Sequence, residues 1–317
     1  MTSGRDAHAH VVRRRRRAAL GGLAAVALLA GSGAAALFGG DEKTESAQAA
    51  PKQLPRGGRE LFPHYRVVAY YGAPQDDELG VLGIGRPAAA GRALLRRSRA
   101  YVRPRRPVMP AFELIAAIVH RAPGPDGTHR QRQAPAVISR YLAAVRRIKG
   151  LLILDVQPGR SDFLEEARAL EPYLKEPDVG LALDSEWSVP EGVVPGEAIG
   201  STDAAAINRV SAYLSELVRR RRLPQKLLVV HQFTAGMVKD RSAVAQRPGL
   251  AIAFNVDGFG APAVKLGVYR RLALARAAPP ARSFFNGMKL FFREDTELMS
   301  PKTVLGVRPR PDLVVYE

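Results

Sequence analysis

Two carboxylates follow an apolar run in the stretch LALDSEWS, residues 181–188. Asp184 and Glu186 stand two positions apart, and Trp187 lies beside them. Side chains two apart on a β-strand share a face, so we expect both carboxylates to point the same way as Ala182. A neighbouring carboxylate raises the pKa of an acid and keeps it protonated near neutral pH. The pair therefore predicts general acid chemistry at the end of a buried strand.

Polar residues also end the other apolar runs of the chain. They are Tyr70 or its neighbour Tyr71, Glu113, Asp155 and Gln157, His231 and Gln232, Asn255 and Asp257, and Lys289. If these runs are the strands of a barrel, their carboxyl ends meet at the face where active sites of that fold lie. Each residue could instead have a structural role, such as capping a loop, forming an ion pair within the core or packing as an aromatic core residue. Together they predict a carboxylate-rich binding site.

The elements that must position these residues alternate between strand and helix. Eight apolar runs indicate strands, at residues 66–72, 108–118, 151–157, 179–187, 226–233, 250–257, 284–292 and 311–316. Helical patterns lie within 79–102 and over 135–149, 162–175, 202–222 and 262–277, with Ser161 expected to cap the third.

Nearly continuous apolar strands that alternate with helices predict a parallel sheet covered on both faces. Eight such units in about 255 residues predict a (β/α)8 TIM barrel. An open doubly wound sheet is the alternative. The glycines of GVLGIG, residues 80–85, do not follow a strand or match a phosphate loop, so we expect no nucleotide cofactor.

The composition excludes several kinds of chemistry. The chain has 317 residues, of which 46% are hydrophobic and 25% charged, and no cysteine. Disulfides, thiolate metal sites, a cysteine nucleophile and cysteine-linked lipid anchors are therefore excluded. The G-x-S-x-G pattern of a serine nucleophile does not occur either. We expect no cofactor.

A formal net charge of +18 makes the chain strongly basic, and most of the excess is arginine. One interpretation is a genome whose base composition favours arginine codons at tolerant surface positions. The other is attraction to an anionic polymer, such as the phosphates of a cell envelope. No zinc knuckle, helix-turn-helix or aromatic RNA-binding motif accompanies the charge, so nucleic acid is not an expected partner.

The first 49 residues read as a targeting segment. Five arginines at 13–17 precede an uncharged run at 18–38, which is typical of a signal peptide or a membrane anchor. Ala47-Gln48-Ala49 fits a cleavage site, and an uncleaved anchor is the alternative. Residues 50–62 read as a linker and 63–317 as the barrel domain. We expect an exported protein, extracellular or held on the outer face of the cytoplasmic membrane.

Two resemblances add to this interpretation. The end Asp184-Ser185-Glu186-Trp187 resembles the fourth-strand D-x-D-x-E signature of family 18 chitinase-like glycosidases, with Ala182 in place of the first aspartate. This resemblance implies Glu186 as the general acid and Asp184 as the residue that orients an N-acetyl group or holds the acid's proton. The stretches LLILDVQPGRSDF, LALDSEW, VVHQF and KLFF are similar to those of exported, uncharacterised barrel proteins of high-GC Gram-positive bacteria.

Three functional classes follow. The first is a glycosidase acting on a cell-envelope carbohydrate, with Glu186 as acid and Asp155, Glu113 or Asp257 as base or nucleophile. The second is a barrel that binds such a glycan without cleaving it. The third is metal-assisted hydrolysis of a phosphoester or amide at His231 and nearby aspartates, although no metal-binding spacing such as H-E-x-x-H is present.

Overall fold

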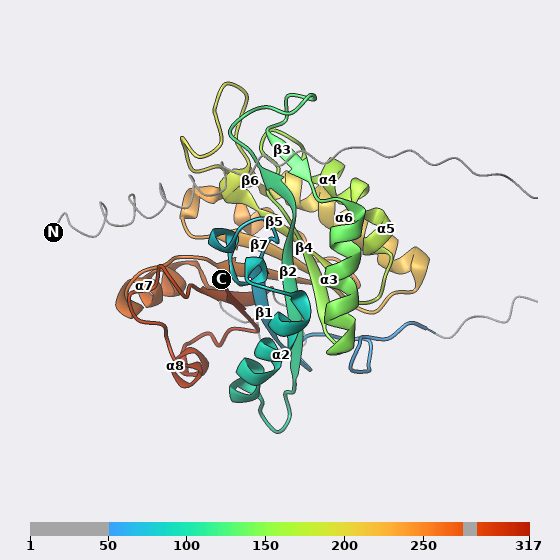
Figure 1. Ribbon diagram of the computed structural model, residues 1–317, viewed down its shortest axis with the longest axis vertical. Helices are drawn as coiled ribbons and strands as arrows, with labels where there is room; N and C mark the ends of the chain where they lie inside the picture. Colours follow the sequence, from blue (N-terminus) through green and yellow to red (C-terminus); the bar gives the residue numbers. More distant parts are fainter. Residues whose placement is uncertain (1–50, 275–283) are drawn as a thin grey trace, which may run out of the picture.

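Eight parallel strands form one closed ring in the computed structural model, which describes residues 51–274 and 284–317 (Figure 1). They are β1 (Arg66–Gly72), β2 (Val108–Val119), β4 (Leu151–Val156), β5 (Val179–Asp184), β7 (Lys226–Gln232), β9 (Leu250–Val256), β10 (Phe285–Leu290) and β11 (Leu313–Tyr316). Each strand pairs in parallel with the next, and β1 pairs with both β2 and β11. The predicted (β/α)8 barrel is confirmed, and the open sheet is excluded because the ring has no free edge.

Helices cover the outside of this ring. They are α2 (Pro87–Ser98), α3 (Pro135–Arg147), α4 (Phe163–Ala169), α5 (Glu171–Leu174), α6 (Ala204–Arg221), α7 (Pro262–Leu272) and α8 (Pro301–Gly306). The longest, α6, buries Ile207, Val210, Leu214 and Leu217 along one face. Full burial of each such side chain stabilises the fold by about 1.5–3 kcal/mol.

Alternation along the strands separates the barrel interior from the helical layer. On β5, Leu181 and Leu183 pack in the outer core, whereas Ala182 faces the interior, as predicted. Small and branched residues such as Ala69, Ile153 and Val229 fill the interior. We call the end where the strands begin the base and the end where they stop the mouth.

The chain enters at the base. Within the segment interpreted as a linker, Leu54, Leu61 and Phe62 are buried and pack against the interior cluster. Arg56 donates hydrogen bonds to the main-chain oxygens of Ile148 and Lys149, which directly follow α3. This segment therefore covers the base of the barrel.

Several short elements were not predicted. They are the strand β3 (Arg130–Arg132), antiparallel to β2; the pair β6 (Thr202–Asp203) and β8 (Val238–Lys239); and the 3-10 turns η1 (Asp77–Leu79), η2 (Val81–Gly83), η3 (Arg99–Tyr101), η5 (Ala235–Met237) and η6 (Arg241–Ala243). The turns η1 and η2 follow β1, and Leu79 from η1 packs near the mouth against Trp187. The loop after β1 thus forms part of the mouth.

Two predicted elements end differently in the structure. The strand expected over 179–187 stops at Asp184, and η4 (Ser185–Trp187) follows as a 3-10 turn. The helix expected over 162–175 divides into α4 and α5 near Pro172, which lacks the N–H that a continuous helix needs. Asp162, not Ser161, caps α4, because its carboxylate accepts hydrogen bonds from the N–H groups of residues 164 and 165.

The predicted signal or anchor, residues 1–49, lies outside the described residues, as does the end of the helix predicted to reach residue 277. Within 51–274 and 284–317, no helix combines the length and apolar character needed to span a bilayer. Export and anchoring therefore stay predictions from the sequence.

Candidate active site

Polar residues occupy most inward-facing positions at the mouth end of the strands, although Ile115 on β2 is apolar and also lines the pocket. They are Tyr71 on β1, Glu113 on β2, Asp155 on β4, Asp184 on β5, His231 on β7, Asn255 on β9 and Lys289 on β10. All are buried, directly above an apolar interior. Alternation of side chains along the strands brings most of the predicted site residues together.

His231 lies at the centre of this layer. Its Nε2 is 2.8 Å from Glu113 Oε1 and 3.6 Å from Asp155 Oδ1, and its Nδ1 is 2.5 Å from Asp257 Oδ2. Burial alone would lower the pKa of His231, but attraction to Asp257 and Glu113 outweighs it and raises the pKa well above the usual value. Each ring nitrogen therefore faces a carboxyl group, an arrangement that favours the protonated imidazole.

Lys289 is the second buried cation of the mouth. Its Nζ lies 2.8 Å from Glu317 Oε2, 3.9 Å from Asp257 Oδ2 and 3.5 Å from the centre of the Tyr71 ring. Burial opposes its charge, but Glu317 and Asp257 outweigh burial and raise the pKa of Lys289. Glu317 is not among the predicted site residues, although it continues the inward alternation of Leu313 and Val315 on β11.

Asp155 lies beneath the mouth surface and accepts a hydrogen bond from the Tyr71 hydroxyl at 3.0 Å. Burial raises the pKa of Asp155 to about 7, with Glu113 adding to the effect and His231 opposing it. Gln157 follows on the same strand end: its Nε2 donates to the Tyr71 hydroxyl oxygen at 3.3 Å, and its Oε1 accepts from the N–H of Val119. These contacts tie β1, β2 and β4 together at the mouth.

The carboxylate pair of the opening motif lies above this layer. Asp184 ends β5 with its side chain inward, and its Oδ1 accepts a hydrogen bond from the N–H of Glu186 at 3.2 Å. Burial, and repulsion from Asp155, raise the pKa of Asp184 well above its usual value. Glu186 faces the same pocket because the turn η4 carries it there, rather than because it shares a strand face with Asp184.

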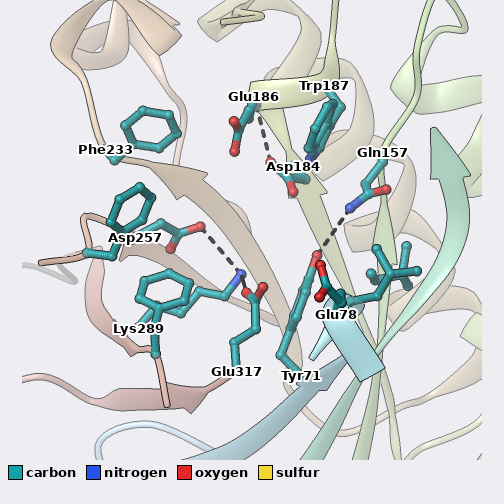
Figure 2. A pocket seen from close by; sticks show the side chains of 14 residues that line it. Tyr71, Glu78, Gln157, Asp184, Glu186, Trp187, Phe233, Asp257, Lys289 and Glu317 are labelled. Atoms are coloured by element: carbon teal, nitrogen blue, oxygen red, sulfur yellow. Dashed lines mark hydrogen bonds and ion pairs between the residues drawn. The ribbon is translucent and has the colours of Figure 1, made fainter. Parts of the chain in front are cut away.

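A pocket opens over these groups (Figure 2). Its polar lining is Glu78, Gln157, Asp184, Glu186, Asp257, Lys289 and Glu317, and its aromatic lining is Tyr71, Trp187, Phe233, Phe259 and Phe291. The enclosed space is about 50 Å³, which is room for a few water molecules or one small polar substituent. The parts of a larger ligand that do not fit this space would lie on the rim of the pocket.

The predicted residues that belong to the site lie at two levels. Gln157, Asp184, Glu186, Trp187, Asp257 and Lys289 line the pocket, whereas Glu113, Asp155, His231 and Asn255 form the layer beneath.

Tyr70 and Gln232 do not belong to the site. Tyr70 faces the helices and packs edge-on to Tyr316 and Phe292, so Tyr71 is the tyrosine of the mouth. Gln232 donates to the main-chain oxygen of Thr234 in its own loop.

One group in the mouth has the composition of a metal site. Ligand atoms of Glu113, Asp155 and His231 all lie within 4.8 Å of one another. In the structure, Glu113 lies at Nε2 of His231 and Asp257 at Nδ1, both within hydrogen-bond distance. A metal ion bound by this group would have to replace the hydrogen between His231 Nε2 and Glu113.

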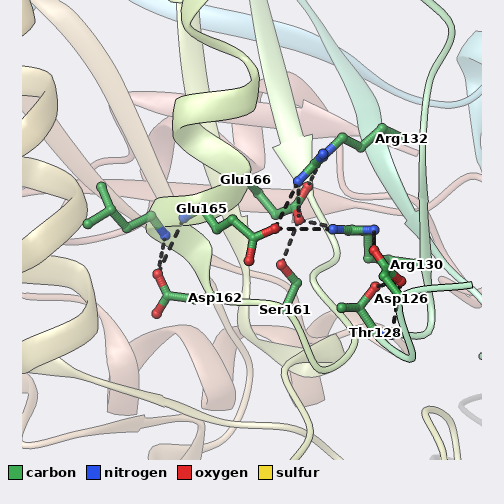
Figure 3. Close-up of polar contacts among 9 residues, drawn as sticks. Asp126, Thr128, Arg130, Arg132, Ser161, Asp162, Glu165 and Glu166 are labelled. Atoms are coloured by element: carbon green, nitrogen blue, oxygen red, sulfur yellow. Dashed lines mark hydrogen bonds and ion pairs between the residues drawn. The ribbon is translucent and has the colours of Figure 1, made fainter. Parts of the chain in front are cut away.

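A second polar cluster, which we call the clamp, holds the wall of the mouth (Figure 3). It comprises Arg130 and Arg132 on β3, and Ser161, Glu165 and Glu166 at the start of α4. Glu166 Oε1 lies 2.7 Å from Arg130 Nε and Oε2 lies 2.7 Å from Arg132 Nε, while Ser161 donates to Oε1 at 2.6 Å. The clamp fastens the β2–β3 hairpin to the loop that begins at Gln157, and so supports that side of the pocket.

Comparisons with known proteins gave a likeness in structure. No protein-family model matches the sequence, and no curated protein matches it. One solved structure that matches is a family GH18 chitinase from Cycas revoluta in complex with allosamidin. The identity is 14%, the match covers 71% of this chain and 68% of the chitinase chain, and the TM-score is 0.37. A likeness at this level concerns the path of the chain and does not extend to its chemistry.

Proposed function

We propose that this barrel is a glycosidase-like hydrolase that acts on a carbohydrate of the cell envelope, with Glu186 as its general acid. The observation that carries the proposal is the pair Asp184 and Glu186 in one aromatic-walled pocket, joined by the hydrogen bond from the Glu186 N–H to Asp184. Asp184 is buried, and burial together with repulsion from Asp155 raises its pKa, which favours a proton on this side chain next to Glu186. That arrangement suits an acid that must deliver a proton near neutral pH.

The reaction needs two groups. Glu186 would donate its proton to the glycosidic oxygen as the bond from that oxygen to the anomeric carbon breaks. The oxygen leaves as a hydroxyl, and water adds to the anomeric carbon after losing a proton to a carboxylate. Of the candidates for that second role, Asp257 lines the pocket, whereas Asp155 and Glu113 lie beneath it. We therefore assign the second role to Asp257.

The contacts of Asp257 support this assignment. It accepts from Asn255 Nδ2 at 2.8 Å and from His231 Nδ1 at 2.5 Å, so two groups fix its orientation. Glu113 and Asp155, which surround the other nitrogen of His231, then act as positioning residues. Around them, Trp187 and Phe233 offer flat apolar surfaces for the carbon face of a sugar ring.

The envelope is proposed as the location because of the basic and apolar pattern in the first 49 residues. A glycan of the envelope would meet the protein after export.

The test is release of reducing ends by the full-length protein from peptidoglycan, chitin oligomers and envelope polysaccharides. We expect Glu186→Gln to lower the rate by about 100-fold or more, the usual contribution of a general acid. Glu191→Gln, an exposed residue in the loop after η4, is the matched control and should retain the parent rate.

Two other outcomes have different meanings. If neither the parent nor the variant releases sugar but both are retained on one glycan, the barrel is a binding protein. If neither release nor retention is seen with the full panel, the carbohydrate proposal is wrong.

A further inference from the structure

The base of the barrel is strongly basic. The segments that lead into the strands lie at this end, and several of them carry exposed cations. These are Arg103 and Arg105 before β2, Arg147 and Lys149 before β4, and the arginines at 219–222 before β7. Arg56 and Arg59, from the segment that covers the base, add two more. The base therefore carries a large share of the excess positive charge of the chain.

Acidic residues near these loops do not balance this charge. Asp178 pairs with Arg146, the buried Asp312 pairs with Arg106, and Glu216 pairs with Arg219. Each of these acids thus already has an arginine partner, while exposed cations remain around them. The mouth has the opposite character, because His231 and Lys289 face a larger number of carboxyls there.

Helix capping accounts for only part of the basic charge. Helices end at the base, and a cation in the last turn is favoured by the partial negative charge of the helix carboxyl end. That reason applies to Arg147 in α3 and to residues 219–221 in α6. It does not apply to Arg103 and Arg105, which lie in the loop between η3 and β2. Arg103 donates hydrogen bonds to the main-chain oxygens of Ala100 and Val102 at the end of η3, and the helix ends do not account for Arg105.

A hollow of about 490 Å³ lies within this basic face. Arg59, Arg219 and Arg222 line it together with Glu60, Gln225 and the apolar side chains of Val218 and Leu223. Arg219 also pairs with Glu216, and Arg59 also donates to the main-chain oxygens of Arg222 and Leu223. Pro51, the first described residue, also lines the hollow, so the preceding 50 residues join the barrel at this face. Arginines around an apolar floor suit a ligand with a phosphate next to hydrocarbon, which is the chemistry of a phospholipid at a bilayer surface.

We propose that the base of the barrel binds an anionic phospholipid surface and turns the mouth away from it. Charge complementarity and the point where the first 50 residues join the barrel both favour a membrane over a soluble polyanion. The carboxyl-rich mouth would be repelled by the same surface, which fixes the orientation further. A glycan on the far side of the barrel then reaches the pocket without competing with the lipid.

The test is titration of the full-length protein with vesicles of phosphatidylcholine alone and of phosphatidylcholine with 30% phosphatidylglycerol, at about 0.1 M salt. The measured quantity is the ratio of the two partition coefficients, which cancels binding that does not depend on charge. The base variant replaces one exposed cation from each of four connections by Gln: Arg105, Arg147, Lys175 and Arg221. The flank variant removes the same charge from exposed helix positions before the last turn, at Arg92, Arg140, Arg209 and Lys302.

We expect the base variant to lower the ratio by about tenfold or more, since each cation near an anionic surface contributes about fivefold in affinity. The flank variant should keep most of the parent ratio, and 0.5 M salt should lower the parent ratio toward one. Equal losses in the two variants, or a parent ratio near one at about 0.1 M salt, would overturn the proposal. Tighter binding to a DNA duplex than to the anionic vesicles at equal phosphate would also overturn it, because the surface would then be a nucleic-acid site.

Discussion

The mouth and the clamp both bury carboxyl groups, but their surroundings shift the pKa of these groups in opposite directions. In the clamp, burial acts to raise the pKa of Glu166, but hydrogen bonds from Arg132, Ser161 and Arg130 outweigh burial and leave the pKa below its usual value. In the mouth, burial raises the pKa of Asp155 and Asp184, and no guanidinium is among the groups that act on either.

The difference separates a structural role from a chemical one. A carboxylate held by two guanidinium groups stays ionised near neutral pH. It therefore stabilises the fold but does not take up or release a proton there. A buried carboxyl whose pKa approaches 7 weakens the fold at neutral pH, but it can hold and release a proton there. Raised pKa values of the second kind are common at active sites, and they support the proposal that the mouth, rather than the clamp, carries the reaction.

The largest effect on stability is expected from the clamp. Glu166→Gln removes the charge that pairs Arg130 and Arg132, and the Glu166 side chain is only 1% exposed. Breaking a buried ion pair from one side leaves Arg130 and Arg132 with only the more exposed Asp126 and Glu165, so we expect a loss of about 3 kcal/mol in the free energy of unfolding. Denaturant unfolding of parent and variant at pH 7 measures it. A loss below about 1 kcal/mol would show that the clamp does not act as a buried ion cluster.

The next effect is a change in the pH dependence of stability. Folded Asp155 ionises near pH 7, whereas an unfolded aspartate ionises near pH 4, so the folded protein keeps a proton that the unfolded chain releases. The free energy of unfolding of the parent then falls by up to about 1.4 kcal/mol for each pH unit between about 4 and 7. Asp155→Asn removes this term, so its stability should fall less steeply across the same window.

Unfolding curves at pH 5, 6 and 7 give both slopes. If the parent and Asp155→Asn lose stability in parallel, Asp155 is not a proton-holding group in the folded state.

The smallest effect is expected from the exposed member of the clamp. Glu165 reaches the same two arginines at 3.4 and 3.2 Å, but its side chain is 59% exposed. An ion pair in water contributes little, so Glu165→Gln should change the free energy of unfolding by less than about 0.5 kcal/mol. The same unfolding measurement applies. A loss as large as that of Glu166→Gln would mean that burial is not what distinguishes the two glutamates.

Periodicity in the sequence predicted the fold and much of the mouth. Apolar runs located all eight strands, and the side-chain period of two placed Ala182 and Asp184 inward. Where the period had no clear phase, the prediction left two residues open: Tyr70 and Tyr71 are adjacent, and in the structure Tyr70 packs against Phe292 whereas Tyr71 lines the pocket.

The clamp and the role of Glu317 lay beyond such reasoning. Arg130 and Glu166 are 36 residues apart, and only the hairpin after β2 brings them together. Nothing local distinguishes these charges from solvated ones. Glu317 acts through its ion pair with Lys289 on the neighbouring strand, and that contact forms only once β10 and β11 have paired.

Closure of the ring also determines when the barrel can fold during synthesis of the chain. Since β1 pairs with β11 as well as with β2, two strand edges stay open during synthesis until nearly the whole chain has been made. Such edges are sites for pairing with other chains, so the newly made protein is prone to aggregate. Contacts between the two ends of a chain also form slowly, because a long loop has to close first. The chain should therefore remain in an unfolded, transportable form longer than a protein whose neighbouring segments pair as they are made.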